Sequence, residues 1–245
     1  MKAESSGSEE RRYLEGPQPR GFEVLHALRI FREYFAGLRA LHFVGPCVTV
    51  FGSARLGEDT PEYQLGRDVG RLLAHAGFGV VTGGGPGLME AANRGASEAG
   101  GHSIGLNIEL PTEQASNKYV DVALTFRHFF IRKVLLVKYS YGFIALPGGL
   151  GTLDELFEAA TLIQTGKVDD FPIVLVGSSF WTPLVEWLRR ELTELHTVDE
   201  ADLESLHIVD TAKDAVSYLQ EVAEKFGLRY HRLPRRWWMG EKRRA

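Results

Sequence analysis

The segment at residues 146–155 contains the residues best suited to chemistry, in the order Leu-Pro-Gly-Gly-Leu-Gly-Thr-Leu-Asp-Glu. It joins an apolar run to a helical pattern, so its glycine N–H groups and the Thr152 hydroxyl are predicted at a helix start, where they suit a phosphate oxygen. Glu155 adds a carboxylate that can stabilise positive charge or deprotonate water. Thr152 and Glu155 also have the spacing of a capping box, in which the glutamate only satisfies backbone groups. The spacing alone leaves both interpretations of Glu155 open.

A basic pair, Arg132 and Lys133, lies on a helix expected at residues 128–139, directly before the strand that leads into this segment. Adjacent helix residues point about 100° apart, so the two side chains do not share a face. One of them can reach a phosphate or Glu155 while the other contacts solvent or a second subunit. A solvated surface pair is the alternative, because basic residues on helices are usually exposed.

A shorter loop after the first expected strand contains Gly52, Ser53 and Arg55. Small residues there allow a ligand to approach the backbone, and the two polar side chains offer donors. Gly52 and Ser53 are therefore predicted substrate contacts. Turns after strands are commonly small and polar, so this loop alone is weak evidence.

A third loop, residues 82–87, reads Thr-Gly-Gly-Gly-Pro-Gly and precedes a helix expected at residues 88–99. Gly84 and Gly85 are predicted to contribute to an anion-binding cradle at the start of that helix. The loop does not match the dinucleotide fingerprint, since the third glycine position holds Leu88 or Glu90. Two alternatives remain: glycines that serve only the tight turn, and a dinucleotide site in which Glu109 binds a ribose.

Short apolar runs alternate with helical patterns along most of the chain. Strands are predicted at residues 48–51, 79–82, 103–108, 142–146, 173–176 and 208–209, with a weaker candidate at 120–125. Helices fit the gaps, and the expected starts are Thr60-Pro61 and Thr182-Pro183. The alternation predicts one α/β domain with a mostly parallel sheet and helices on both faces. Ligands of such sheets bind at the carboxyl ends of the strands, where all three loops lie.

Residues 1–20 are polar and are expected to be mobile, and residues 227–245 form a basic and aromatic tail. The catalytic domain is expected over residues 21–226, with a leading amphipathic helix over residues 21–41. The apolar face of that helix is predicted to comprise Phe22, Leu25, Leu28, Phe31, Phe35 and Leu38. The helix after the glycine-rich segment is expected to face the core with Leu153, Leu156, Phe157, Ala160 and Ile163.

Composition excludes several classes of function. The net charge of −4 argues against a general nucleic-acid binder. The single cysteine, Cys47, lies in an apolar run and is expected to be a buried thiol, so neither a disulfide nor a cysteine metal cluster is predicted. No apolar stretch reaches the roughly 20 residues needed to span a membrane, and the polar start does not resemble a signal peptide. The cytoplasm is the expected location.

Three segments together resemble the LOG ("lonely guy") family of cytokinin-activating phosphoribohydrolases, many of them mislabelled lysine decarboxylases. They are residues 83–90, the pair Arg132 and Lys133, and residues 147–155. The resemblance runs from about residue 46 to residue 216. It implies a Rossmann-like fold, a homodimer or larger homo-oligomer, and hydrolysis of a nucleoside 5′-monophosphate to free base and ribose 5-phosphate. It implies neither a metal nor a redox cofactor.

Carried onto matching positions, the resemblance implies that Arg132 and Glu155 form the catalytic pair. Implied nucleotide contacts are Lys133, Gly149, Leu150, Gly151, Thr152, Leu153 and Asp154, with Glu113 and Thr161 as looser matches. In the resulting mechanism Glu155 stabilises the ribose cation and activates water, while Arg132 keeps that carboxylate ionised.

The chain also departs from the family pattern. Plant-like members carry Met-His shortly before Arg-Lys, whereas Phe129, Phe130 and Ile131 precede the pair here. Glu90 replaces a glycine of those members. A general, AMP-like purine monophosphate is therefore the expected substrate, with a cytokinin riboside monophosphate as the other candidate. Two rival functions remain: a non-catalytic nucleotide or cofactor carrier on the same fold, and a dinucleotide oxidoreductase that uses Glu109.

Overall fold

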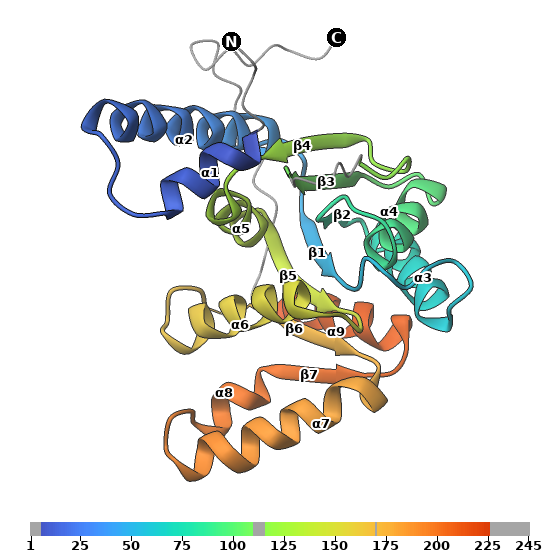
Figure 1. Cartoon of the computed structure of the whole chain (residues 1–245). Helices are drawn as coiled ribbons and strands as arrows, with labels where there is room; N and C mark the ends of the chain where they lie inside the picture. Colours follow the sequence, from blue (N-terminus) through green and yellow to red (C-terminus); the bar gives the residue numbers. More distant parts are fainter. Residues whose placement is uncertain (1–5, 110–115, 170, 226–245) are drawn as a thin grey trace.

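Parallel strands form one central sheet in the computed structural model, which describes residues 6–109, 116–169 and 171–225 (Figure 1). The seven strands of the described part lie in the order β4-β3-β2-β1-β5-β6-β7. Their bounds are β1 Cys47–Phe51, β2 Gly79–Thr82, β3 Ser103–Ile108, β4 Val122–Phe126, β5 Ser140–Ala145, β6 Ile173–Val176 and β7 Leu206–Val209. Every neighbouring pair is parallel. The predicted fold class is thus confirmed.

Helices cover both faces of the sheet (Figure 1). One face packs on α3 Pro61–His75, α4 Leu88–Glu98 and α9 Ala212–Lys225. The other packs on α2 Arg20–Leu41, α5 Phe129–Lys138, α6 Leu150–Gln164, α7 Ser178–Leu188 and α8 Glu200–Glu204. Helix α1 Ser6–Leu14 precedes α2, and a π-helical turn, Arg189–Thr193, follows α7. Two hydrophobic cores, one on each side of the sheet, result from this layering.

Local sequence signals set most of these boundaries. The predicted strands all form, including the weak candidate, which is β4. Thr60 caps α3 by accepting a hydrogen bond from the Tyr63 N–H at 3.2 Å, and Gly77 follows the helix with a φ of +86°. Cys47 is fully buried, as expected. No described helix is long and apolar enough to cross a membrane.

Helix α7 begins four residues before its expected start at Thr182. A contact distant in sequence causes this difference: the Asp210 carboxylate accepts hydrogen bonds from the Ser178 N–H at 2.7 Å and the Ser178 hydroxyl at 3.0 Å. This cap starts the helix at Ser178, so Pro183 lies inside it rather than at its first position.

The N-terminal region also differs from expectation. Residues 1–20 were expected to be mobile, yet α1 forms within them, and the ring of its Tyr13 stacks on His26 of α2 at 4.1 Å. Helix α2 forms as predicted, but Leu25, Leu28 and Phe31 on its apolar face are 58, 55 and 64% exposed. The tail at residues 227–245 lies outside the described residues.

Glycines allow α3 and α4 to pack backbone to backbone. A Cβ at Gly95 would collide with the Arg67 carbonyl, and one at Gly70 would collide with the Ala92 carbonyl. The two helices therefore approach more closely than side chains would allow.

Gly95→Ala should lower the free energy of unfolding by about 1–3 kcal/mol, because the added methyl forces α3 and α4 apart. Gly21→Ala is the matched control: it adds the same methyl within α2 where no atom lies within 4 Å. Helix propensity predicts that the control is neutral or stabilising by up to about 1 kcal/mol. Urea unfolding followed by circular dichroism measures both, and equal effects would contradict the close-packing explanation.

Candidate active site

The direction of the chain connections reverses beside β1, which pairs with β2 on one side and β5 on the other. The loops after β1 and β5 therefore meet at the carboxyl edge of the sheet, the place where open α/β sheets bind ligands. The Ser53 N–H donates to the Pro147 carbonyl at 3.0 Å and joins the two loops. The Leu88 N–H donates to the Ser53 carbonyl at 2.8 Å and adds the start of α4 to the same junction.

A cavity of about 590 Å³ opens at this junction. Its lining includes four groups: the loop after β1, part of the loop after β2 with α4, the first turns of α6, and one face of α5. The residues are Phe51, Gly52, Ser53, Ala54, Arg55, Gly83, Met89, Arg132, Leu136, Gly149, Leu150, Gly151, Thr152 and Glu155. All three loops singled out from the sequence thus contribute to one cavity.

An ion pair between α5 and α6 lies in the cavity wall. Arg132 Nη2 donates to Glu155 Oε1 at 3.0 Å, and the two side chains are only 14% and 3% exposed. Arg132 Nε is buried and has no hydrogen-bond partner among the described residues. The guanidinium therefore holds the carboxylate and keeps a donor for another group.

Glu155 does not cap α6, so the capping-box interpretation is wrong. The helix begins at Leu150 with Gly149 as its N-cap, three residues before the start that a capping box at Thr152 requires. Thr152 and Glu155 are buried inside the helix, and Glu155 pairs with Arg132 instead of backbone. The first-turn N–H groups of Leu150 and Gly151 have no preceding helical carbonyls, and both residues line the cavity. This is the anion-binding geometry of a helix N-terminus.

Burial raises the pKa of Glu155, and the positive charges of Arg132 and Lys133 oppose that rise without cancelling it. Arg132 thus favours the ionised carboxylate, in the direction expected, while the loss of solvent has the larger effect on the pKa. A raised pKa makes the Glu155 carboxylate a stronger proton acceptor than an exposed glutamate.

Lys133 points away from Arg132, as the helix geometry predicted. Its ammonium pairs with Asp154 at 2.8 Å and Glu158 at 2.6 Å. Burial lowers the pKa of Lys133, but its hydrogen bonds to Asp154 and Glu158 outweigh this effect, so the pKa is raised. Its side chain is 15% exposed, so the surface-pair alternative is wrong for both basic residues. Lys133 and Asp154 lie outside the cavity lining and join α5 to α6.

Other predicted contacts lie elsewhere. Leu153 packs against the core, and the exposed Thr161 donates to the Phe157 carbonyl within α6. Phe157 was expected in the core but is 38% exposed, since Leu156 and Ala159 form the buried face. Glu113 lies outside the described residues.

The glycine loop after β2 contributes Gly83 to the cavity, whereas Gly84 and Gly85 lie outside its lining. A buried polar network that the sequence analysis missed shapes this loop. Asn117 donates its backbone N–H to the Gly84 carbonyl at 2.9 Å and its side chain to the Gly85 carbonyl at 3.1 Å. It also bonds Asn93 of α4 at 3.0 Å. An asparagine in a loop is a common surface residue, so the sequence held no signal for this role.

Glu109 lies away from the glycine loops. Its carboxylate pairs with Arg127 at 3.3 Å, and it lines a different cavity. The dinucleotide alternative thus loses its ribose-binding residue. Within the described ranges, no group of three or more potential side-chain ligands could hold a metal ion.

A family model described as "possible lysine decarboxylase" matches residues 89–219. The chain is 29% identical over 179 residues to the cytokinin riboside 5'-monophosphate phosphoribohydrolase LOG3 of Arabidopsis thaliana, covering 72% of this chain and 82% of the relative. It is 34% identical over 156 residues to the cytokinin riboside 5'-monophosphate phosphoribohydrolase of Mycobacterium tuberculosis. That match covers 62% of this chain and 82% of the relative. A solved structure, the molybdenum cofactor binding protein of Rippkaea orientalis, matches with a TM-score of 0.55 at 24% identity, over 72% of this chain and 96% of that chain. At this identity the likeness is one of fold alone.

The pKa of Glu155 leads to a testable pH dependence of stability. Because its folded pKa lies above the unfolded value, the wild-type protein loses stability as the pH rises through the folded pKa. Glutamine stays neutral, so it adds no such pH dependence. The free energy of unfolding of Glu155→Gln should therefore increase relative to that of the wild type as the pH rises. Urea unfolding from about pH 4 to about pH 8 measures the difference. If the difference in unfolding free energy stays constant, or if it increases in favour of the wild type as the pH rises, the effect of Arg132 on the pKa of Glu155 outweighs that of burial.

Proposed function

We propose that the cavity of this chain hydrolyses the N-glycosidic bond of a nucleoside 5′-monophosphate. The chain belongs to the LOG family of phosphoribohydrolases. The products are a free base and ribose 5-phosphate. The resemblance drawn from the sequence motifs is confirmed by the family match. The proposal for the reaction rests above all on the buried Arg132–Glu155 pair beside the N-terminus of α6.

The description of the family model as a lysine decarboxylase does not fit this site. Decarboxylation of lysine generally runs through pyridoxal phosphate bound to a lysine. Among the described residues that line the cavity, none is a lysine. Lys133, the nearest in sequence to Arg132, is held by two carboxylates outside the lining.

The first turn of α6 binds the 5′-phosphate in this proposal. Its N–H groups and positive dipole end face the cavity, and the Thr152 hydroxyl adds a further donor. A phosphate at this position directs the attached ribose toward Glu155, which lies one turn further along the same helix. Binding thus places the anomeric carbon beside the carboxylate.

Hydrolysis breaks the bond between the anomeric carbon and the base nitrogen, and the base leaves with the electron pair. The ribose ring gains positive charge, which the Glu155 carboxylate stabilises in a site shielded from solvent. Glu155 also orients a water molecule and accepts its proton as the oxygen bonds to the anomeric carbon. The departing base takes up a proton. Arg132 holds Glu155 in place and offers its free Nε to the nucleotide.

A planar, AMP-like base fits the remaining wall of the cavity. Phe51, Met89 and Leu136 supply apolar surface to the cavity lining. A carrier would use the same loops, but it has no use for a solvent-shielded carboxylate with a raised pKa. The cytoplasmic location stays a prediction.

A homodimer is part of the proposal because large apolar side chains are exposed on three adjacent helices. Helix α2 packs on α5 through the contact of Gly37 with Leu135, and ion pairs join α5 to α6. All three helices lie on the same side of the sheet (Figure 1). The exposed side chains are Val24, Leu25, Leu28, Phe31, Phe129, Phe130, Val134, Leu150 and Phe157. A second copy of the chain would cover this face and shield the nearby cavity.

Glu155→Gln should lower kcat on AMP by at least about 100-fold, because glutamine neither stabilises the ribose cation as an anion nor accepts a proton. AMP should still bind. Chromatographic detection of adenine and ribose 5-phosphate, with calorimetric titration of AMP, measures both effects. Glu62→Gln on α3, outside the cavity, is the matched control and should retain the wild-type rate. A wild-type protein that binds AMP without releasing adenine would favour the carrier.

Phe31→Glu should dissociate the dimer, because it places a charge in the proposed apolar interface. Phe180→Glu is the control: Phe180 is 45% exposed on α7, away from the α2, α5 and α6 face. Analytical ultracentrifugation should give twice the chain mass for the wild type and the control, and the chain mass for Phe31→Glu. A wild type that sediments as a monomer would contradict the interface.

A further inference from the structure

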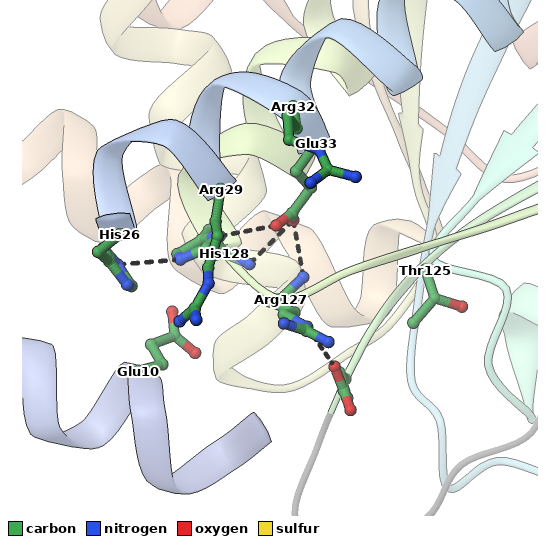
Figure 2. Close-up of a pocket in the computed structure, with 9 residues that line it drawn as sticks. Glu10, His26, Arg29, Arg32, Glu33, Thr125, Arg127 and His128 are labelled. Atoms are coloured by element: carbon green, nitrogen blue, oxygen red, sulfur yellow. Dashed lines mark hydrogen bonds and ion pairs between the residues drawn. The ribbon is translucent and has the colours of Figure 1, made fainter. Parts of the chain in front are cut away.

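A buried cluster joins α2 to the start of α5 (Figure 2). Glu33 of α2 accepts hydrogen bonds from the backbone N–H groups of Arg127 at 2.7 Å and His128 at 3.3 Å. Its second oxygen lies 2.8 Å from His128 Nδ1. The Nε2 atoms of His128 and His26 are 3.2 Å apart. The two histidines are only 3% and 2% exposed, so water does not compete for these bonds.

Glu33 therefore provides a cap that the local sequence lacks. His128 is the N-cap of α5, and its own side chain makes no capping hydrogen bond. A carboxylate on another helix takes that place, and its negative charge lies at the positive end of the α5 dipole. Burial opposes ionisation of Glu33, but the hydrogen bonds from His128 and Arg127 outweigh it and lower the pKa of Glu33.

The proton positions in this cluster follow from its hydrogen bonds. An ionised Glu33 accepts from His128 Nδ1–H. The short contact between the two Nε2 atoms needs one donor and one acceptor, so it holds only when a single proton lies between them. Protonation of both imidazoles places two N–H groups and two positive charges against each other. Burial, followed by the charge of His128, lowers the pKa of His26, so His26 takes up a proton at a lower pH than an exposed imidazole does.

The same helix start carries the catalytic arginine. The Arg132 N–H bonds to the His128 carbonyl at 3.4 Å in the first turn of α5. Its guanidinium reaches Glu155 from there at 3.0 Å. A shift of the α5 start thus moves the guanidinium relative to Glu155, and misplacements of about 1 Å can cost about 100-fold in rate.

We propose that Glu33 and His128 are positioning residues for the reaction, which hold the start of α5 and so fix the Arg132 guanidinium against Glu155. A proton on both facing Nε2 atoms, which the two imidazoles carry only when both are protonated, releases this hold. The inference rests on the proposed hydrolysis for its kinetic consequence, while the anchoring of α5 stands on the cluster geometry. Because Tyr13 stacks on His26, α1 is connected to the cluster as well.

Several charged groups surround His26 and His128 and set the direction of this response. They line the adjoining cavity and come from α1, α2, the end of β3 and the residues around β4: Glu10, Arg29, Arg32, Glu33, Glu109 and Arg127. Glu10 and Glu33 favour a proton on His26, whereas burial and His128 oppose it with the larger effect. Since the folded pKa of His26 is lowered, the hold is present above the unfolded pKa and is lost as the pH falls through the folded pKa.

Kinetics with AMP test the positioning role. His128→Ala should lower kcat by about 10- to 100-fold and change KM by a smaller factor, because Arg132 is displaced while the phosphate site at the start of α6 stays intact. His128→Asn should recover most of that loss, since its amide N–H can replace Nδ1–H as the donor to Glu33. An Asn variant as slow as the Ala variant, or a change in KM alone, would overturn the proposal. Melting curves show whether the Ala variant folds. If it does not fold, the kinetics of the Asn variant alone test the positioning role.

Hydrogen exchange tests the anchor without any substrate. In the wild type, the Arg127 and His128 amides should be protected at about pH 8 and lose that protection, relative to β3 amides, as the pH is lowered stepwise below the usual histidine pKa of about 6.5. In His26→Phe, which keeps a ring against Tyr13, protection should persist at the lower pH. An identical pH response in both proteins would overturn the release by His26. A protein that shows this exchange pattern but never hydrolyses AMP would instead contradict the proposed function.

Discussion

One buried ion pair, Arg132 with Glu155, is the constraint on which the site depends. Taking a carboxylate out of water is costly, and the raised pKa of Glu155 shows that its partner does not fully offset that cost. The fold tolerates this cost because other contacts, besides this ion pair, hold α5 and α6 in place. Lys133 joins α5 to α6 through Asp154 and Glu158, and the strands β1 and β5 bring the loops together. A stored electrostatic cost of this kind is typical of groups kept for chemistry rather than stability.

The topology explains why the motifs are so far apart in sequence. The loops after β1, β2 and β5 converge because all three strands are parallel and end at one edge of the sheet. The hydrogen bond from the Leu88 N–H to the Ser53 carbonyl holds the start of α4 at that edge. The start of α6 presents N–H groups to the same space. The proposed phosphate site and the Glu155 carboxylate therefore lie about one helical turn apart.

Local patterns predicted much of this arrangement, and distant contacts explain what they missed. The strands were predictable because buried apolar runs depend on neighbouring residues alone. The start of α7 was not, since the cap on Ser178 comes from Asp210, 32 residues away in the chain. The cluster of Glu33 and His128 joins residues 95 positions apart. Likewise, the role of Asn117 under the glycine loop depends on a tertiary contact that no local motif encodes.

A crystal structure of the Glu155→Gln variant with AMP bound tests the central claim most directly. The 5′-phosphate should lie within hydrogen-bond distance of the N–H groups of Leu150 and Gly151, and the anomeric carbon should face residue 155 beside Arg132. A nucleotide bound outside this cavity, or one with its phosphate turned away from α6, would contradict the account.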